Sequence, residues 1–332
     1  MASAAALSPD RILRDLANVW VTLGKQGQPE TGMGVLRACS LNLVVVAEET
    51  DEFQALGETL AALMPEHPAR TIVIRYGAAP QPELSARVFA QCWMPFGQRR
   101  QICCEQIEIA ASEKALDDAL SLAGAVTAAD LPVIAWCRSP RLMDRDGFRK
   151  LAGLARRVIV DTAPFSHAKA SLARLAELVG QGLSLGDLSW TRISRWRGMI
   201  AQTFENRERL ARVPGEVRIR VRFGGKEAPA TARYLGAWIA ESLKAAGIQV
   251  TLTLSSDASA AQGELSGAEL DGAGLRVELS SGNGRLRVKM EDGLEHCASH
   301  PPATDYLLMR EELGIVGRDP VFERTLRAAA AL

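Results

Sequence analysis

The first half of the chain alternates between two hydrophobic patterns, one typical of strands and one typical of helices. Short apolar runs bounded by Gly, Pro and Asp are separated by segments whose apolar residues recur every three or four positions. The ranges that predict strands are 35–49, 70–76, 85–93, 100–110, 131–137 and 156–161, and those that predict helices are 9–23, 51–64, 113–126, 144–154 and 166–179. This order predicts an α/β domain, and polar–apolar alternation in the third and fourth runs predicts an antiparallel edge, hence a mixed sheet.

The last third of the chain has a different pattern. A strand at 216–223 is followed by a long helix at 228–246 and then by short strands separated by Gly, Ser, Asn and Asp. Ser-Gly-Asn-Gly at 281–284 predicts a hairpin turn, and two helices end the chain. We therefore predict an α/β domain over 1–186, a connecting Trp/Arg-rich helix over 187–213, and a smaller α+β domain over 214–332.

The connecting segment concentrates two tryptophans and three arginines within eight residues, from Trp190 to Arg197. One continuous helix over 189–210 would place both tryptophans on a single apolar stripe about 120° wide. Trp190 and Trp196 are therefore expected to pack in a core or at a domain joint. Arg197 falls inside the stripe, where a buried cation requires a partner, and we expect a carboxylate to pair with it.

Arg192 and Arg195 lie on the opposite side of the same predicted helix, free to meet a partner or an anionic ligand. Trp and Arg dominate the energetics of protein interfaces. The partner-binding hypothesis therefore names Trp190, Arg192, Arg195, Trp196 and Arg197. A core helix with solvated arginines explains the same pattern and stays open, as does weak binding of a small anion.

Composition narrows the classes of function. The 332 residues carry 39 basic and 39 acidic side chains, so the strong basic field that bulk nucleic-acid binding needs is missing. The N-terminus lacks the pattern of a secretory signal, and the most apolar run, 41–47, is too short to span a bilayer. We expect a cytoplasmic protein that binds neither nucleic acid nor membrane.

Cysteine chemistry is expected to be unremarkable in this chain. The six cysteines are too few and too irregularly spaced for a secreted disulfide framework, so buried reduced thiols are expected. Cys103 and Cys104 are neighbours in a predicted strand, which would send their sulfurs to opposite faces of the sheet. A redox pair is more often spaced Cys-x-x-Cys, so we expect no redox pair here.

No other motif forms a coherent catalytic or ligand-binding set. The glycines between 24 and 34 follow a helix and precede a strand, the reverse of a dinucleotide fingerprint. Glu-His-Cys-Ala-Ser-His at 295–300 matches no strong zinc spacing, and His67 has no recognisable nucleophile. Asp161 ends a strand, where it could line a ligand crevice or cap a helix. We therefore expect no catalytic residues, cofactor or metal.

Five stretches resemble one known family, the glucose-6-phosphate dehydrogenase assembly proteins called OpcA. They are GVLRACSLNLVV (34–45), EHPARTIVI (66–74), CCEQIEI (103–109), DLPVIAWCR (130–138) and DLSWTRISRWRGMIAQTFE (187–205). The last is the most specific, and the resemblance covers residues 34–205 better than the C-terminal third. One departure is Trp136-Cys137, where family members tend to carry two tryptophans.

The resemblance implies a non-catalytic partner of glucose-6-phosphate dehydrogenase. Such proteins promote the oligomeric assembly of the dehydrogenase and raise its activity, which directs carbon into the oxidative pentose phosphate pathway. An enzyme or sensor that binds a sugar phosphate or a nucleotide in the α/β domain is the alternative. The sequence feature that would favour this alternative, a glycine turn directly after a strand, is missing.

Overall fold

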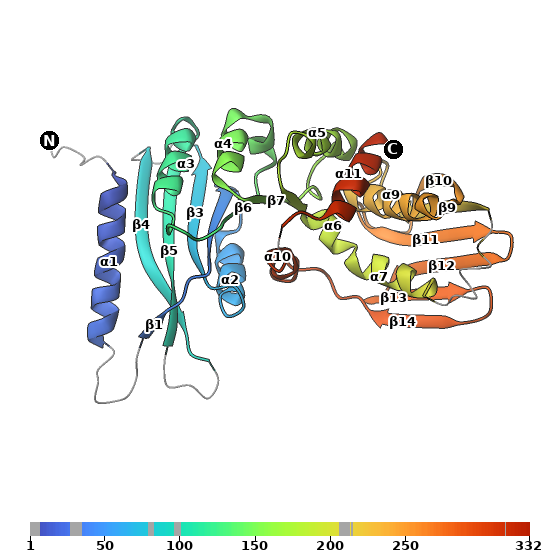
Figure 1. Cartoon of the computed structure of the whole chain (residues 1–332), viewed down its shortest axis with the longest axis horizontal. Coiled ribbons are helices and arrows are strands. Elements are labelled where there is room, and N and C mark those ends of the chain that lie inside the picture. Colours follow the sequence, from blue (N-terminus) through green and yellow to red (C-terminus); the bar gives the residue numbers. More distant parts are fainter. Residues whose placement is uncertain are drawn as a thin grey trace. The chain divides into compact units, whose positions relative to one another are not determined.

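The computed structural model describes residues 7–26, 35–78, 83–95, 101–205, 213, 215–315 and 317–332 (Figure 1). Contacts divide the chain into two compact units, an N-terminal unit of residues 1–160 and a C-terminal unit of residues 161–332. The hydrophobic pattern predicts the first boundary at residue 186. The contacts instead group residues 161–186 with the C-terminal unit.

The N-terminal unit is built on a mixed sheet in which neighbouring strands run in the order β1-β5-β3-β2-β6-β7, with β4 paired to β5. All of these pairs are parallel except β4 with β5. The strands are β1 (Val35–Arg37), β2 (Leu41–Glu48), β3 (Ala69–Gly77), β4 (Leu84–Trp93), β5 (Gln101–Ser112), β6 (Val133–Cys137) and β7 (Arg157–Val160). The predicted α/β class and antiparallel edge are confirmed.

β2 is the central strand of this sheet because it pairs with β3 on one side and β6 on the other. Seven of its eight residues are buried, as a continuous Val/Leu run in a covered parallel strand requires. The run predicted as one strand over 35–49 is divided, because Arg37 pairs with Cys103 of β5 whereas Leu41 pairs with Ala69 of β3.

Helices and short 3-10 turns complete the N-terminal unit. They are α1 (Pro9–Gln26), α2 (Phe53–Leu63), η2 (Glu113–Ala115), α3 (Leu116–Ala125), η3 (Pro140–Asp144) and α4 (Asp146–Leu154). Figure 1 shows α1 standing beside β4 at the edge of the sheet. Ser8 caps α1, because its Oγ accepts a hydrogen bond from the Arg11 N–H at 3.3 Å.

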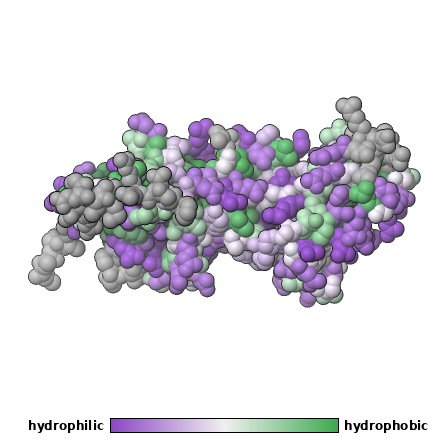
Figure 2. Space-filling view, turned by 90° about the horizontal axis from the view of Figure 1, so that it is seen from below, coloured by the Kyte–Doolittle hydropathy of each residue, from purple (hydrophilic) through white to green (hydrophobic). Residues whose placement is uncertain are grey.

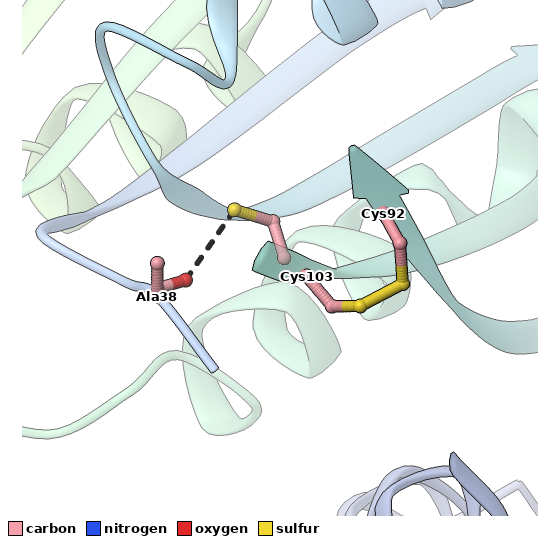
Figure 3. Close-up of a disulfide and its surroundings, with 4 residues drawn as sticks. Ala38, Cys92 and Cys103 are labelled. Atoms are coloured by element: carbon pink, nitrogen blue, oxygen red, sulfur yellow. Dashed lines mark hydrogen bonds between the residues drawn. A yellow bond between two sulfur atoms is a disulfide. The ribbon is translucent and has the colours of Figure 1, made fainter. Parts of the chain in front are cut away.

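A disulfide joins Cys92 of β4 to Cys103 of β5, which are directly paired residues (Figure 3). The expectation of reduced thiols is therefore wrong for these two cysteines. Sequence spacing gave no sign of the bond, because β-pairing brings residues 92 and 103 together. Cys104 is a free thiol that donates to the Ala38 carbonyl at 3.3 Å, and burial raises its pKa to about 11. Both Cys103 and Cys104 are fully buried.

The C-terminal unit is built on a second sheet, ordered β10-β9-β11-β12-β13-β14, in which only β9 and β10 are parallel. The strands of this sheet are β9 (Glu216–Phe223), β10 (Gln249–Ser256), β11 (Leu265–Gly272), β12 (Leu275–Gly282), β13 (Arg285–Met290) and β14 (Glu295–Ser299). The short strand β8 (Leu185–Asp187) also belongs to the C-terminal unit but not to this sheet. The helices of the unit are α5 (Ala168–Gly180), α6 (Leu188–Arg192), α7 (Ser194–Thr203), α9 (Ala230–Ala245), α10 (Asp305–Leu313) and α11 (Pro320–Ala331). This is the predicted α+β arrangement.

One face of β9 forms part of the core of this unit. Its residues alternate between exposed and buried positions, so that Val217, Ile219, Val221 and Phe223 point inward, and α9 packs against β9 and β10. The predicted hairpin at 281–284 is also confirmed. Asn283 and Gly284 have φ angles of 51° and 68°, the left-handed conformation that Asn-Gly turns adopt at low cost.

Polar side chains cover most of the face of the protein that Figure 2 shows. Figure 2 shows a mostly hydrophilic face on which hydrophobic residues are scattered in small groups. Among the described residues, every helix is too short or too polar to cross a bilayer.

Candidate functional site

The Trp/Arg-rich segment begins at Asp187, a carboxylate buried completely inside the C-terminal unit. Asp187 caps α6 by accepting from the Ser189 N–H at 2.9 Å. It also accepts from the Thr162 N–H at 3.1 Å, the Thr162 hydroxyl at 2.7 Å and the Tyr234 hydroxyl at 2.8 Å. These four donors connect β8, α6 and α9, so Asp187 organises the interior of the unit.

Burial dominates the electrostatics of Asp187. Loss of hydration, reinforced by the nearby charge of Asp161, raises its pKa to about 6 from an ordinary 3.8, against the opposing effect of its hydrogen bonds. Near neutral pH the protein therefore contains a buried carboxylate whose ionised form is held at a cost in folding free energy.

This raised pKa predicts the pH dependence of stability. Because the folded pKa of Asp187 exceeds the unfolded value, its contribution is fully present below pH 3.8 and is lost as pH rises through about 6. The loss amounts to about 3 kcal/mol. Urea unfolding at about pH 4 and about pH 7 measures it. The Asp187→Asn variant cannot ionise at this position. The free energy of unfolding of wild type minus that of the variant should therefore be about 3 kcal/mol smaller at pH 7 than at pH 4. A difference that does not change with pH contradicts the prediction.

Trp190 lies in an aromatic cluster beside Asp187. Its ring centroid is 5.9 Å from those of Tyr234 and Phe322, and its Nε1 donates to the Asp319 carboxylate at 3.3 Å. Trp190 and Trp196 are 3% and 2% exposed. The prediction that both tryptophans pack in a core is confirmed.

Arg197 has a different partner from the one expected. Its guanidinium stacks 3.6 Å from the centroid of the Trp190 ring, and its Nη2 donates to the Ser194 hydroxyl at 3.0 Å. Burial lowers the pKa of Arg197, although the carboxylates of Asp319, Glu311 and Glu312 act in the opposite direction. A cation–π contact therefore occupies the position where we expected a direct ion pair.

The single helix predicted over 189–210 is wrong within the described residues. Ile193 has φ and ψ of −93° and 7°, and it separates α6 from α7. A turn at this position re-aims the residues that follow it. The positions that one continuous helix would give to Arg192, Arg195 and Arg197 around its axis are consequently not the observed ones.

Arg192 is not free. Its two terminal nitrogens each lie 2.6 Å from the Asp161 carboxylate, and its side chain is 24% exposed. Asp161 thus serves as an ion-pair partner, and it also accepts from the Ala163 N–H at 3.0 Å. Arg195 is exposed, as predicted, and donates to the Ser299 carbonyl at 2.7 Å. Of the three arginines, Arg195 alone presents an exposed side chain.

A second group of polar residues lies at the carboxyl ends of β2 and β6 in the N-terminal unit. From β2 the chain adds β3 and then β5 on one side of this strand, and it then crosses to add β6 on the other side. The order in which strands are added therefore reverses between β2 and β6. Ligands of open α/β sheets bind at this position. No motif in the sequence marks these residues, because they become neighbours only through the strand order.

Ion pairs fill this position. Glu48, the last residue of β2, accepts from the Ser139 hydroxyl and from Arg141 Nε at 2.8 Å. Burial acts to raise the pKa of Glu48, but the bonds from Arg141 and Ser139 outweigh it and lower the pKa. Asp51 lies 3.6 Å from Arg138. A dinucleotide pyrophosphate placed here would face carboxylates, and the turn Glu48-Glu49-Thr50-Asp51 has no glycine to let phosphate approach.

The remaining sequence candidates do not come together. Within the described part of the chain, no three His, Cys, Asp or Glu side chains form a group suited to a metal. Glu295, His296 and Cys297 lie exposed on β14. Most of the glycine loop, residues 27–34, lies outside the described residues.

Comparison with known proteins identifies the family. Two family models, described as the N-terminal and C-terminal domains of a glucose-6-phosphate dehydrogenase subunit, match residues 61–177 and 183–326. The chain belongs to the OpcA family. The first model ends, and the second begins, just before the Trp/Arg-rich segment, which lies wholly within the C-terminal match.

Curated relatives agree with this assignment. The chain is 30% identical over 143 residues to an OxPP cycle protein OpcA of Nostoc punctiforme, covering 43% of this chain and 30% of that protein. It is 28% identical over 200 residues to the protein of the same name from Synechocystis, covering 58% and 40%. The match thus spans less than half the length of these relatives.

Solved structures share the general architecture only. An NAD binding oxidoreductase from Klebsiella pneumoniae aligns with a TM-score of 0.49 at 11% identity, covering 88% of this chain and 94% of its own. A biliverdin reductase from Synechocystis aligns with a TM-score of 0.46 at 9% identity, covering 88% and 97%. At these scores the likeness carries no argument about activity.

Proposed function

We propose that this protein is a non-catalytic assembly factor and activator of glucose-6-phosphate dehydrogenase, acting by protein–protein contact in the cytoplasm. The observation that carries the proposal is the match of two dehydrogenase-subunit family models to residues 61–177 and 183–326. Through this partner the protein would act in the oxidative pentose phosphate pathway. The alternative, an enzyme or sensor that binds a sugar phosphate or a nucleotide in the α/β domain, is weakened by the carboxylates at the carboxyl ends of β2 and β6.

We place the contact on the face formed by α7 and α10, defined by Arg195, Leu307 and Arg310. These three residues line one hollow of about 270 Å³ in the C-terminal unit. Arg195 is exposed, and Leu307 is 36% exposed despite its apolar side chain. Arginine beside exposed leucine is a combination suited to an interface. The buried tryptophans would then act indirectly, by fixing the position of α7.

Activation requires that the protein bind the active form of the dehydrogenase more tightly than the inactive form. Coupling energies of this kind are typically about 1–3 kcal/mol, which corresponds to an about 5–150-fold shift in the equilibrium. The protein need not contribute a catalytic group for this effect.

Charge reversal at Arg195 tests both the function and the face. We expect wild-type protein mixed with the dehydrogenase of the same organism to form a complex of larger mass and to raise NADPH production. Arg195→Glu should weaken the complex about tenfold or more, because the reversed charge would meet a surface complementary to arginine. Complex mass and dehydrogenase rate, titrated against the protein, measure the effect.

The matched control is Arg149→Glu, an arginine with a 67% exposed side chain on α4 of the N-terminal unit. This variant should bind as wild type does. Equal weakening by both substitutions would show a non-specific charge effect and remove the α7–α10 face from the proposal. A dehydrogenase that neither binds nor responds to the wild-type protein would overturn the proposed function itself.

A further inference from the structure

A cavity of about 560 Å³ lies in the C-terminal unit, where three loops of the second sheet gather. They are the β10–β11 loop with the start of β11 (residues 259–266), the hairpin 281–284, and residues 300–303 after β14. Arg192 of α6 and Thr231 of α9 complete the wall. This volume falls in the range of sites for small metabolites, about 300–1,000 Å³.

The beginning of α9 supplies the first feature that would attract a ligand. The N-cap residue is Pro229, which forms no side-chain cap, and Thr231 is the second residue of this 16-residue helix. Helix N-termini carry partial positive charge and unsatisfied N–H groups, so they favour anions. Because Thr231 lines the cavity, the cavity lies at this end of the helix.

Two unpartnered polar atoms belong to residues that line the same cavity. Thr231 is only 9% exposed, and its Oγ1 has no hydrogen-bond partner among the described residues. The Nδ1 atom of His300, whose ring contacts Trp196 edge-on, is likewise buried and without a partner there. Buried polar groups in native proteins are nearly always satisfied, so two exceptions in one wall call for an explanation.

Arg192 adds a positioned cation. Both of its terminal nitrogens bond to Asp161, which fixes the guanidinium at the cavity wall. Glu264, Ser259 and Asn283 also line the wall, and all three have side chains that can pair with hydroxyls; the Ser259 hydroxyl, which donates to Asp257 at 2.6 Å, can still accept. A wall that offers partners for hydroxyls beside a place for an anion suits a ligand that carries both hydroxyl groups and a negative charge.

We propose that this cavity binds a small organic anion bearing hydroxyl groups, of the class of phosphorylated or carboxylated sugars. Its anionic group would lie between Arg192 and the first turn of α9, within reach of Thr231. Its hydroxyls would meet Ser259, Asn283 and Glu264. This inference goes beyond the proposed function, because it gives the chain a ligand of its own in the absence of any protein partner.

Calorimetric titration of the isolated full chain tests the site with three named probes: glucose 6-phosphate, gluconate and uncharged glucose. At least one of the two anions is expected to bind and to raise Tm, as a ligand specific for the folded state must. Glucose should bind at least about tenfold more weakly, because it lacks the charge that Arg192 and the helix recognise. Binding of neither anion, or equal binding of glucose, would overturn the proposal.

Thr231→Val locates the site. Valine has nearly the same shape, and the lost hydroxyl has no partner, so Tm without ligand should stay equal or rise. Affinity for the anion should fall about tenfold or more. The control is Ser242→Ala, an exposed hydroxyl on the same helix, which should leave affinity unchanged. Wild-type affinity in Thr231→Val would overturn the assignment, and neither result depends on complex formation with the dehydrogenase.

Discussion

Replacing Trp190 by alanine is expected to destabilise the C-terminal unit by about 3–5 kcal/mol. Trp190 is 3% exposed and contacts Tyr234, Phe322 and Arg197. Removing its ring leaves a cavity beside Tyr234 and Phe322. It also removes the aromatic face on which the half-buried Arg197 guanidinium stacks. The loss therefore combines transfer, packing and cation–π terms in one position.

Thermal and urea unfolding of the full chain measure this effect. For a unit of this size a loss of 3–5 kcal/mol corresponds to a fall in Tm of roughly 6–20 °C. The control is Trp190→Phe, which keeps a ring in the cluster and loses chiefly the bond to Asp319. It should cost about 1–2 kcal/mol. Equal losses in the two variants would show that the hydrogen bond, and not the aromatic packing, stabilises the unit.

Hydrophobic periodicity predicted the elements of this fold well because burial follows it. The continuous apolar run of β2 and the alternation in β9 both translate directly into buried strands. The same reasoning failed at Ile193, because a single turn between two short helices leaves the apolar spacing almost unchanged. Propensity cannot show such a break, since all residues from Ser189 to Arg197 are acceptable in a helix.

Buried charges were the main features that sequence could not reveal. Asp187 reads as a surface residue in a Gly-Asp loop, yet its partners Thr162 and Tyr234 lie 25 and 47 positions away. Glu105 shares its face of the strand with Ile107 and Ile109, where it is only 2% exposed, and the sequence does not show which cations pair with it there. In each case the partner comes from another element, and the chain order carries no signal of that pairing.

The polar groups at the two candidate ligand positions differ in whether the protein supplies their partners. At the carboxyl ends of β2 and β6 the charges are paired with one another, so the position that binds ligands in many α/β proteins is occupied by the protein's own side chains. In the C-terminal unit the unpartnered atoms of Thr231 and His300 are left for something else to satisfy. We therefore expect a ligand in the cavity of the C-terminal unit and not at the carboxyl ends of β2 and β6.

Replacing Glu105 by alanine is expected to destabilise the N-terminal unit by about 3–5 kcal/mol. Its carboxylate lies 2.6 Å from Arg70 Nε and 2.8 Å from Arg37, and it accepts from Trp20 Nε1 at 2.6 Å. Arg70 is itself buried, so loss of Glu105 leaves an uncompensated charge in the core. Trp20 belongs to α1, so the substitution also removes the hydrogen bond that ties this helix to β5.

The double variant Glu105→Leu with Arg70→Met separates these two causes. If the unpaired cation dominates, the double variant should recover most of the lost stability, because apolar replacements of a buried ion pair are often neutral or stabilising. If the loss of the Trp20 bond dominates, stability stays low and the amides of α1 exchange faster than in wild type.

Glu108→Ala is the control on the same strand. Its partner Arg87 has a 70% exposed side chain, so the substitution should lower the free energy of unfolding by at most about 1 kcal/mol. A larger loss would mean that any carboxylate removed from β5 destabilises the unit, whether or not it pairs with a buried cation.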